Sequence, residues 1–220
     1  MKKFLLAMIL VASPAFAGES KTPKEFYTMD SMGCMLLREC TKNVQRVESI
    51  ATIADVHPDS DYSIVADEFH NMLTSLDQIG VNVFLADEKY FPVGHRGVYH
   101  TVGNNFFLNK SFMHRPGVLM SVMRHEGWHA AQDCMAGTID NSLIAIIKPE
   151  EDVPPLWREM VERTYPKSAV PWEAEATWAG KTKGMTADAL SACATGEMWK
   201  VYEPTPLTRK YLVEEGFMSK

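Results

Sequence analysis

Two histidines stand four residues apart near the middle of the chain, and a glutamate directly follows the first of them. On a helix, residues i and i+4 lie one turn apart on the same face, so His125 and His129 can direct their imidazoles at one metal ion, with Glu126 beside it. Zinc lowers the pKa of a bound water towards about 7, and a neighbouring carboxylate can take the proton as the water attacks a polarised carbonyl. The spacing therefore predicts a zinc site with Glu126 as general base.

A catalytic zinc needs a third protein ligand and an open coordination position. In the arrangement His-Glu-x-x-His-x-x-Gly-x-x-His, a glycine and a third histidine would occupy positions that here hold Gln132 and Met135. No histidine follows His129, so a ligand from that direction must be acidic. The downstream candidates are Glu173 and Glu175.

The segment Glu173-Ala174-Glu175-Ala176-Thr177 resembles the glutamate segment of the gluzincin branch of the zincin metallopeptidases, the group that includes thermolysin. In that branch the ligand glutamate opens a Glu-x-x-x-Asp segment, whose aspartate steadies a metal-binding histidine. The resemblance nominates Glu173 as third zinc ligand, with Glu175 as the alternate register, and makes Ala176 a small residue that lets two helices approach. Thr177 replaces the aspartate, and its hydroxyl can still accept a hydrogen bond from an imidazole, without the charge that raises ligand basicity.

Two further site residues follow from the same resemblance. Asp133, four residues after His129, matches an acidic position that follows the motif in thermolysin-like proteins; a solvated carboxylate at the helix end is the alternative. Peptidases of this class also need a donor for the developing oxyanion, which after His129 must be tyrosine or arginine here. Tyr165 is the preferred candidate over Tyr202 and Tyr211 because it shortly precedes Glu173, although each of the three is also suited to packing.

The N-terminus predicts export. Lys2 and Lys3 precede a short apolar run, and Ala15-Phe16-Ala17 supplies small residues at cleavage spacing. This pattern is typical of a signal peptide, 1–17, followed by a single catalytic domain, 18–220, and the run is shorter than the roughly 20 residues that span a bilayer. We therefore expect a secreted or periplasmic protein without stable membrane insertion.

The charge of the chain makes nucleic acid an unfavourable partner. The whole chain carries a formal charge of −6, and removing Lys2 and Lys3 leaves 20 basic side chains against 28 acidic ones, with no basic block. Nucleic-acid binding usually requires a clustered basic surface. The expected partner is instead a peptide or protein substrate.

The four cysteines, Cys34, Cys40, Cys134 and Cys193, predict two disulfides, because their number is even and an exported protein meets an oxidising compartment. Three connectivities exist. Cys34 and Cys40 fall in a segment with helical periodicity, where six residues of separation place them about 9 Å apart along the axis and on different faces. We therefore expect each of them to pair with Cys134 or Cys193.

The order of elements predicts an α+β fold that is mainly helical, with a small β-sheet next to the active-site helix. Apolar spacing predicts helices over 31–54 and 62–80. Short β-branched or alternating runs predict strands at 81–85, 97–102 and 103–109. The last of these is the candidate edge strand for an extended substrate, and an ordinary core hairpin strand is the alternative. Pro116 at a first helical turn and Gly137 beyond the end delimit a helix of about 20 residues that carries the motif. Proline-separated helices should follow.

These patterns favour an exported zinc metallopeptidase that hydrolyses peptide bonds through a zinc-bound water. Two other functions fit the sequence. One is a zincin-fold module that binds zinc without catalysis, which the replacement of aspartate by Thr177 and the missing downstream histidine allow. The other is a metal-free, disulfide-bonded secreted interaction protein.

Overall fold

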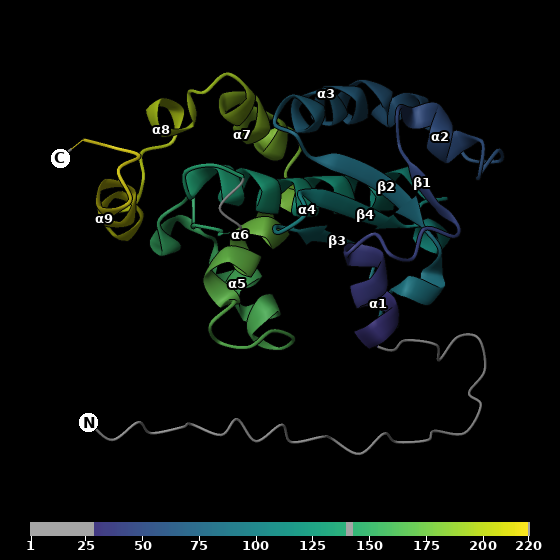
Figure 1. Ribbon diagram of the computed structural model, residues 1–220, viewed down its shortest axis with the longest axis horizontal. Helices are drawn as coiled ribbons and strands as arrows, with labels where there is room; N and C mark the ends of the chain where they lie inside the picture. Colours follow the sequence, from purple (N-terminus) through teal and green to yellow (C-terminus); the bar gives the residue numbers. More distant parts are fainter. Residues whose placement is uncertain (1–28, 140–142, 220) are drawn as a thin grey trace, which may run out of the picture.

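The computed structural model describes residues 29–139 and 143–219 of the chain, so the predicted signal peptide, 1–17, lies outside the described residues. The helices are α1 (Met29–Leu36), α2 (Ile50–Ala54), α3 (Ala66–Gln78), α4 (Pro116–Met135), α5 (Pro155–Glu162), α6 (Val170–Lys181), α7 (Met185–Ala194), α8 (Met198–Val201) and α9 (Pro206–Glu214). The strands are β1 (Val44–Arg46), β2 (Asn82–Ala86), β3 (Gly97–His100) and β4 (Asn105–Asn109), and short 3-10 turns are η2 (Ser63–Val65), η3 (Glu88–Tyr90), η4 (Lys110–Phe112) and η5 (Glu150–Asp152). This is the predicted α+β fold, mostly helical around a small sheet (Figure 1).

The four strands form one mixed sheet in the order β1-β2-β4-β3. β2 runs parallel to β4, while β1 and β3 pair antiparallel with β2 and β4 respectively. The prediction that 103–109 forms the edge strand is wrong, because β4 lies between β2 and β3 and all five of its residues are buried. A strand buried on both faces is stabilised by neighbours on both sides. The edge on this side of the sheet is β3.

Side chains alternate between the two faces of the central strands, as the pleat requires. Val83 and Leu85 of β2 face the main core, which also contains side chains of α3, α4 and α7. Phe84 packs on the opposite face with Met35 of α1 and Phe91 after η3. Figure 1 shows α3 above the sheet and α1 below it. The sheet is therefore covered on both faces.

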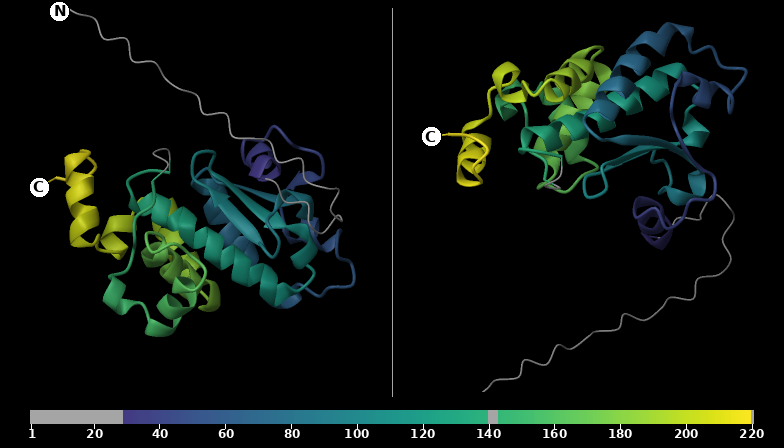
Figure 2. Two further views of the ribbon diagram at one scale, coloured as in Figure 1. Left: turned by 90° about the horizontal axis from the view of Figure 1, so that it is seen from below. Right: turned by 45° about the horizontal axis from the view of Figure 1, so that its top comes forward.

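Helix α4 begins at Pro116, as the sequence predicts, and lies in the middle of the fold against α3, α6, α7 and β3 (Figure 2). Arg124 of α4 donates two hydrogen bonds of 2.7 Å, from Nε and Nη2, to the carboxylate of Glu68 in α3. Thr186 of α7 donates to the backbone carbonyl of Arg124. These contacts fix α4 on the side of α3 and α7, one residue before His125.

The predicted long helix over 31–54 is wrong. Helix α1 ends at Leu36, the chain enters the left-handed region at Arg38 and Asn43, and Val44 opens strand β1. A second, separate helix, α2, then begins after Ser49, whose hydroxyl accepts the N–H of Ala51. The apolar spacing that indicated one helix arises instead from side chains that bury against different parts of the sheet and core.

The predicted pairing of Cys34 and Cys40 with the distant cysteines is also wrong. The disulfides are Cys34–Cys40 and Cys134–Cys193. The chain turns back directly after α1, where the N–H groups of Glu39 and Cys40 both donate to the carbonyl of Cys34, and this brings the Cα atoms of the first pair to 5.2 Å. The second disulfide joins the end of α4 to α7. No helix in the described part of the chain has the length and hydropathy needed to cross a membrane.

Candidate metal centre

The two histidines of the motif lie on one face of α4, one turn apart, with ring centroids separated by 5.0 Å. Glu173 lies in the first turn of α6, and its Oε2 atom is 3.4 Å from Nε2 of His125 and 3.7 Å from Nε2 of His129. The three ligand atoms all lie within 4.8 Å of one another. The structure therefore brings together the three residues that the sequence nominated, two from α4 and one from α6.

Close packing of α6 on α4 makes this convergence possible. Ala176 is fully buried, and a Cβ atom added at Gly180 would lie 3.1 Å from the carbonyl oxygen of Ser121 and 3.3 Å from Cβ of His125. Side chains larger than these would push the two helix axes apart. The small residues of α6 thus set the distance between Glu173 and the histidines.

The geometry fits a zinc ion. Two ligand atoms that each lie about 2.1 Å from a tetrahedral ion are about 3.4 Å apart, close to the separations between Glu173 and the two imidazoles. Oε2 of Glu173 is buried and accepts no hydrogen bond from the described residues. Two imidazole nitrogens and one carboxylate oxygen form the donor set that catalytic zinc uses with one position left open. The side chains of His125, His129 and Glu173 remain 19%, 12% and 15% exposed, so the centre can be reached from solvent.

Electrostatics couple the ligands in the metal-free state. Burial favours the neutral acid of Glu173, but the two imidazoles beside it hold the pKa of this carboxyl well below its usual range. Burial alone would lower the pKa of His129, yet Glu173, Glu126 and Gln132 together raise it to about 9. A metal ion must replace the proton on His129, so metal affinity should fall as the pH decreases.

The carboxylate of Glu126 is held by the edge strand of the sheet. Its Oε2 atom accepts a 3.0 Å hydrogen bond from the backbone N–H of Tyr99 in β3. Gly97 permits this approach, because a Cβ atom there would lie 2.5 Å from Cγ1 of Val122 and 3.1 Å from Cγ of Glu126. Glu126 therefore projects between α4 and β3, beside the imidazole of His125 rather than into the protein.

Behind the metal ligands lies a buried polar chain that the sequence did not indicate. Nδ1 of His129 is 2.8 Å from Oε1 of Gln132, and Nε2 of Gln132 donates to Oε2 of Glu175 at 2.7 Å and to the carbonyl of Trp172. Because the amide nitrogen of Gln132 already has two acceptors, its oxygen faces His129 and accepts the Nδ1–H. This arrangement leaves Nε2 of His129 as the ligand atom.

Glu175, the alternate ligand, contacts other residues of α4 than the two histidines that Glu173 faces. Its carboxylate is fully buried and also accepts N–H groups from Trp128, Ile147 and Lys148. Burial raises the pKa of Glu175, and the hydrogen bonds that it accepts oppose this shift. The sequence did contain a signal for the different surroundings of Glu173 and Glu175, because residues i and i+2 of a helix face different directions.

The remaining predicted site residues lie around the centre. Thr177 lines the same cleft as His125, but among the described residues it is the amide oxygen of Gln132 that accepts the Nδ1–H of His129. Asp133 is fully buried, so it is not a solvated carboxylate at the helix end, and it accepts the hydroxyl of Tyr99 in the edge strand at 2.8 Å.

The open side of the centre is a cleft of about 420 Å³, walled by α4, α6, the start of β3 and the segment after α5. Tyr165 lines it with His125 and Glu126. Burial, followed by the nearby charges of Glu173 and Glu126, raises the pKa of Tyr165, so the phenol stays protonated beside the carboxylates. Tyr165, which the sequence nominated as oxyanion donor, therefore lines the cleft with two of the motif residues.

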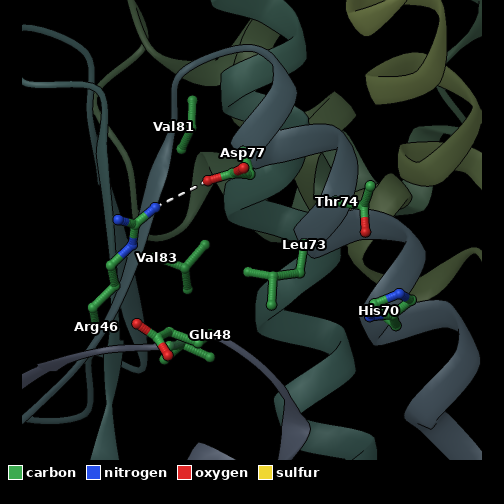
Figure 3. A pocket seen from close by; sticks show the side chains of 9 residues that line it. Arg46, Glu48, His70, Leu73, Thr74, Asp77, Val81 and Val83 are labelled. Carbon is green, nitrogen blue, oxygen red and sulfur yellow. Dashed lines mark hydrogen bonds and ion pairs between the residues drawn. The ribbon is translucent and has the colours of Figure 1, made fainter.

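A different pocket lies between β1, β2 and α3 (Figure 3). Arg46 and Asp77 face each other across it and form a 2.9 Å ion pair. His70 projects from α3 away from that pair. Because the guanidinium and the carboxylate compensate each other, this pocket does not compete with the cleft as a site for chemistry.

Comparison of the chain with protein-family models, curated proteins and solved structures gives no match. The class of site is therefore defined by its own geometry: two histidines and a glutamate that can hold one metal ion, with an oriented carboxylate and a phenol at the open side.

Proposed function

We propose that this protein is a zinc metallopeptidase of the gluzincin type, with His125, His129 and Glu173 as the zinc ligands. The observation that carries the proposal is the convergence of these three ligand atoms at separations that suit one tetrahedral zinc ion. The oriented carboxylate of Glu126 at the same cleft favours hydrolysis over a purely structural ion.

When bound, zinc would polarise the scissile carbonyl and acidify the attacking water. Glu126 accepts the proton of that water, and the N–H of Tyr99 keeps the carboxylate aimed along the edge of the sheet. The protonated hydroxyl of Tyr165 donates to the oxyanion as it develops. Gln132 holds His129 with Nε2 towards the ion.

The edge strand β3 supports an extended peptide beside these groups. In an antiparallel pair, every second residue hydrogen-bonds to the neighbouring strand. The carbonyl of Arg96 accepts the N–H of Asn109 after this pattern, so the N–H and C=O groups of Gly97 and Tyr99 point away from β4. Backbone groups of Gly97 at the cleft can therefore hydrogen-bond a substrate strand.

The two disulfides are compatible with the secreted or periplasmic location that the N-terminal pattern predicts. Such a location would expose the protein to extracellular or envelope peptides. Mass determination of the N-terminus of the exported protein would contradict this part of the proposal if residues 1–17 were still present.

Metal analysis tests the ligands. The purified wild type should contain about one zinc per chain, and Glu173→Ala should lose it because two imidazoles alone hold zinc weakly. Glu159→Ala, which removes an exposed glutamate of α5, is the matched control and should keep the metal. Full zinc content in Glu173→Ala would refute the assignment, and a wild type without zinc affinity would favour a metal-free interaction protein.

Peptide cleavage tests the reaction. Glu126→Gln should retain zinc and lose about 10²- to 10⁴-fold in kcat, the usual contribution of a general base. Turnover equal to wild type would overturn the mechanism. A wild type that binds zinc but cleaves nothing in a diverse peptide mixture would instead be a zinc-binding module.

A further inference from the structure

Two cationic side chains stand on the walls of the cleft. Arg96 directly precedes β3, and Lys181 is the last residue of α6; both line the same cavity as His125 and Glu126. Both side chains are exposed. They come from different elements, so the cleft is positive on two sides of the metal centre.

Neither cation is neutralised by the protein. Nζ of Lys181 donates a 3.0 Å hydrogen bond to the hydroxyl of Ser121, and the guanidinium of Arg96 lies 5.5 Å from the ring centroid of Phe112. Within residues 29–139 and 143–219, neither has a carboxylate within 4.0 Å. Their charges are therefore available to a ligand.

The carboxylates of the cleft are already engaged. Glu173 faces the two histidines, and Glu126 accepts the N–H of Tyr99. A zinc ion on the centre would add two positive charges to the same space. With that ion bound, the positive charges would exceed those of the two carboxylates, so in a chain with a formal charge of −6 the cleft would be a local positive region that can orient an anionic peptide.

The position of Lys181 sets the distance to the reacting bond. Glu173 and Lys181 belong to one helix, and a rise of about 1.5 Å per residue separates their Cα atoms by about 12 Å along its axis. The hydrogen bond from Nζ of Lys181 to the hydroxyl of Ser121 on α4 holds the ammonium group over the cleft. An extended peptide advances about 3.3 Å per residue, so Lys181 reaches a substrate group two to four residues from the scissile bond.

We propose that this cleft selects peptides that carry a carboxylate two to four residues from the cleaved bond, recognised by Lys181 and Arg96. The proposal rests on the proposed peptidase function and names its substrate class. The carboxylate comes either from an aspartate or glutamate side chain or from a free C-terminus, since both present the same acceptor pair.

Matched peptides separate these sources. One set shares a single neutral sequence with an amidated C-terminus and differs only by glutamate or glutamine at each position around the cleaved bond. A second pair differs only by a free or amidated C-terminus. With zinc-loaded wild type, kcat/KM should be about fivefold higher for the carboxylate member, the size expected of two partly exposed charge pairs, and high salt should reduce the ratio.

Neutralising variants test the assignment to these residues. In Lys181→Gln and Arg96→Gln the ratio of kcat/KM between carboxylate and neutral peptides should fall to about twofold, and in the double variant it should fall to one. Lys183→Gln removes the same charge from an exposed position just after α6 and should leave the preference intact. A ratio of one in the wild type, or an unchanged ratio in the double variant, would overturn the proposal.

Binding to zinc-loaded Glu126→Gln distinguishes this proposal from the function on which it rests. If the wild type cleaves no peptide of either set, the peptidase function is wrong, and the anisotropy of labelled peptides then decides the matter of recognition. Tighter binding of the carboxylate members that is lost on adding Lys181→Gln and Arg96→Gln supports the proposal. Equal binding of carboxylate and amide members refutes it.

Discussion

Replacing Gln132 by leucine tests whether the buried polar chain behind His129 tunes the metal centre. The side chain is fully buried, and leucine keeps much of its volume while removing both the acceptor for Nδ1 of His129 and the donor to Glu175. Without that acceptor the imidazole of His129 can rotate and change tautomer. We expect zinc affinity to fall about 10- to 100-fold, or about 1.4 to 2.7 kcal/mol.

The same substitution should also lower the free energy of unfolding of the metal-free protein. It leaves the N–H of His129, and the carbonyl of Trp172, without the amide partner. Glu175 keeps its three other donors, so its share of the loss is smaller. The carbonyl of Trp172 lies within α6 and can keep its intrahelical partner, so the main cost is the unpaired N–H of His129, about 1 to 3 kcal/mol.

Zinc titration against a chromophoric chelator measures the first effect, and urea unfolding of the metal-free protein measures the second. Thr208→Val is the matched control: it removes the hydroxyl from a buried threonine pair in α9, 3.0 Å from Thr205, and should change stability without changing zinc affinity. Gln132→Glu keeps an acceptor for His129 and should retain more affinity than Gln132→Leu. Wild-type affinity in Gln132→Leu would refute the role assigned to this chain.

Three further predictions concern the support of the centre. The hydrogen bonds from Arg124 outweigh burial and hold the pKa of Glu68 below its ordinary value of 4.5. The resulting stabilisation is present above pH 4.5 and is lost as the pH falls through the lowered pKa. Acid-induced loss of Tm should therefore be steeper in metal-free wild type than in Glu68→Gln, and equal slopes would contradict this. Gly180→Val should separate α6 from α4, weaken zinc binding and cost about 1 to 3 kcal/mol in urea unfolding, whereas Gly117→Val, which meets no neighbour, should preserve zinc affinity. Replacing Cys134 and Cys193 by alanine opens a link across 59 residues and should cost about 4 kcal/mol of unfolding free energy in the chain-entropy model; a cost near zero would show that the linkage constrains little.

The sequence identified the group of residues that could hold a metal ion because helical geometry is local. Four residues of separation on a helix oblige His125 and His129 to share a face, whatever the rest of the fold does. Elimination of a third histidine then restricted the search to acidic residues, and the family resemblance chose Glu173. The structure adds the distances, which depend on how closely α6 approaches α4.

The N-terminal region was mispredicted because its periodicity is ambiguous over short stretches. Val44 and Val47 are spaced as on a helix, yet Val44 is in a strand that pairs with β2, and the N–H of Val47 donates to the carbonyl of Val83. The backbone turn at positive φ at Arg38 has no glycine to announce it, and Asn43, a residue type that tolerates this region, was only a weak signal. The local Cys34–Cys40 disulfide depends on the turn after α1, so the prediction of a continuous helix over 31–54 also excluded this pairing.

The edge strand was misassigned for a related reason. The sequence gives strands but not their lateral order, and Phe106, Phe107 and Leu108 indicate a strand without showing that it is buried on both sides. In the structure the β3–β4 hairpin places the shorter and more polar strand outside, beside α4. Gly97, the first residue of the predicted strand 97–102, is the point where β3 comes close enough to α4 to hold Glu126.

Glu173 and Glu175 show how one short helical segment can supply two different electrostatic roles. Residues i and i+2 of a helix point about 200° apart, so if one carboxylate faces the histidines the other must face away from them. Glu173 meets two imidazoles and remains the acceptor of a cation, while Glu175 is enclosed by N–H donors from a tryptophan, a glutamine and two backbone amides. Gln132 joins the two sides, since its amide touches both Glu175 and His129. At His129, the acceptor for the imidazole N–H is thus a neutral amide and not the aspartate that Thr177 replaces, and the negative charge of Glu175 lies one hydrogen bond further away.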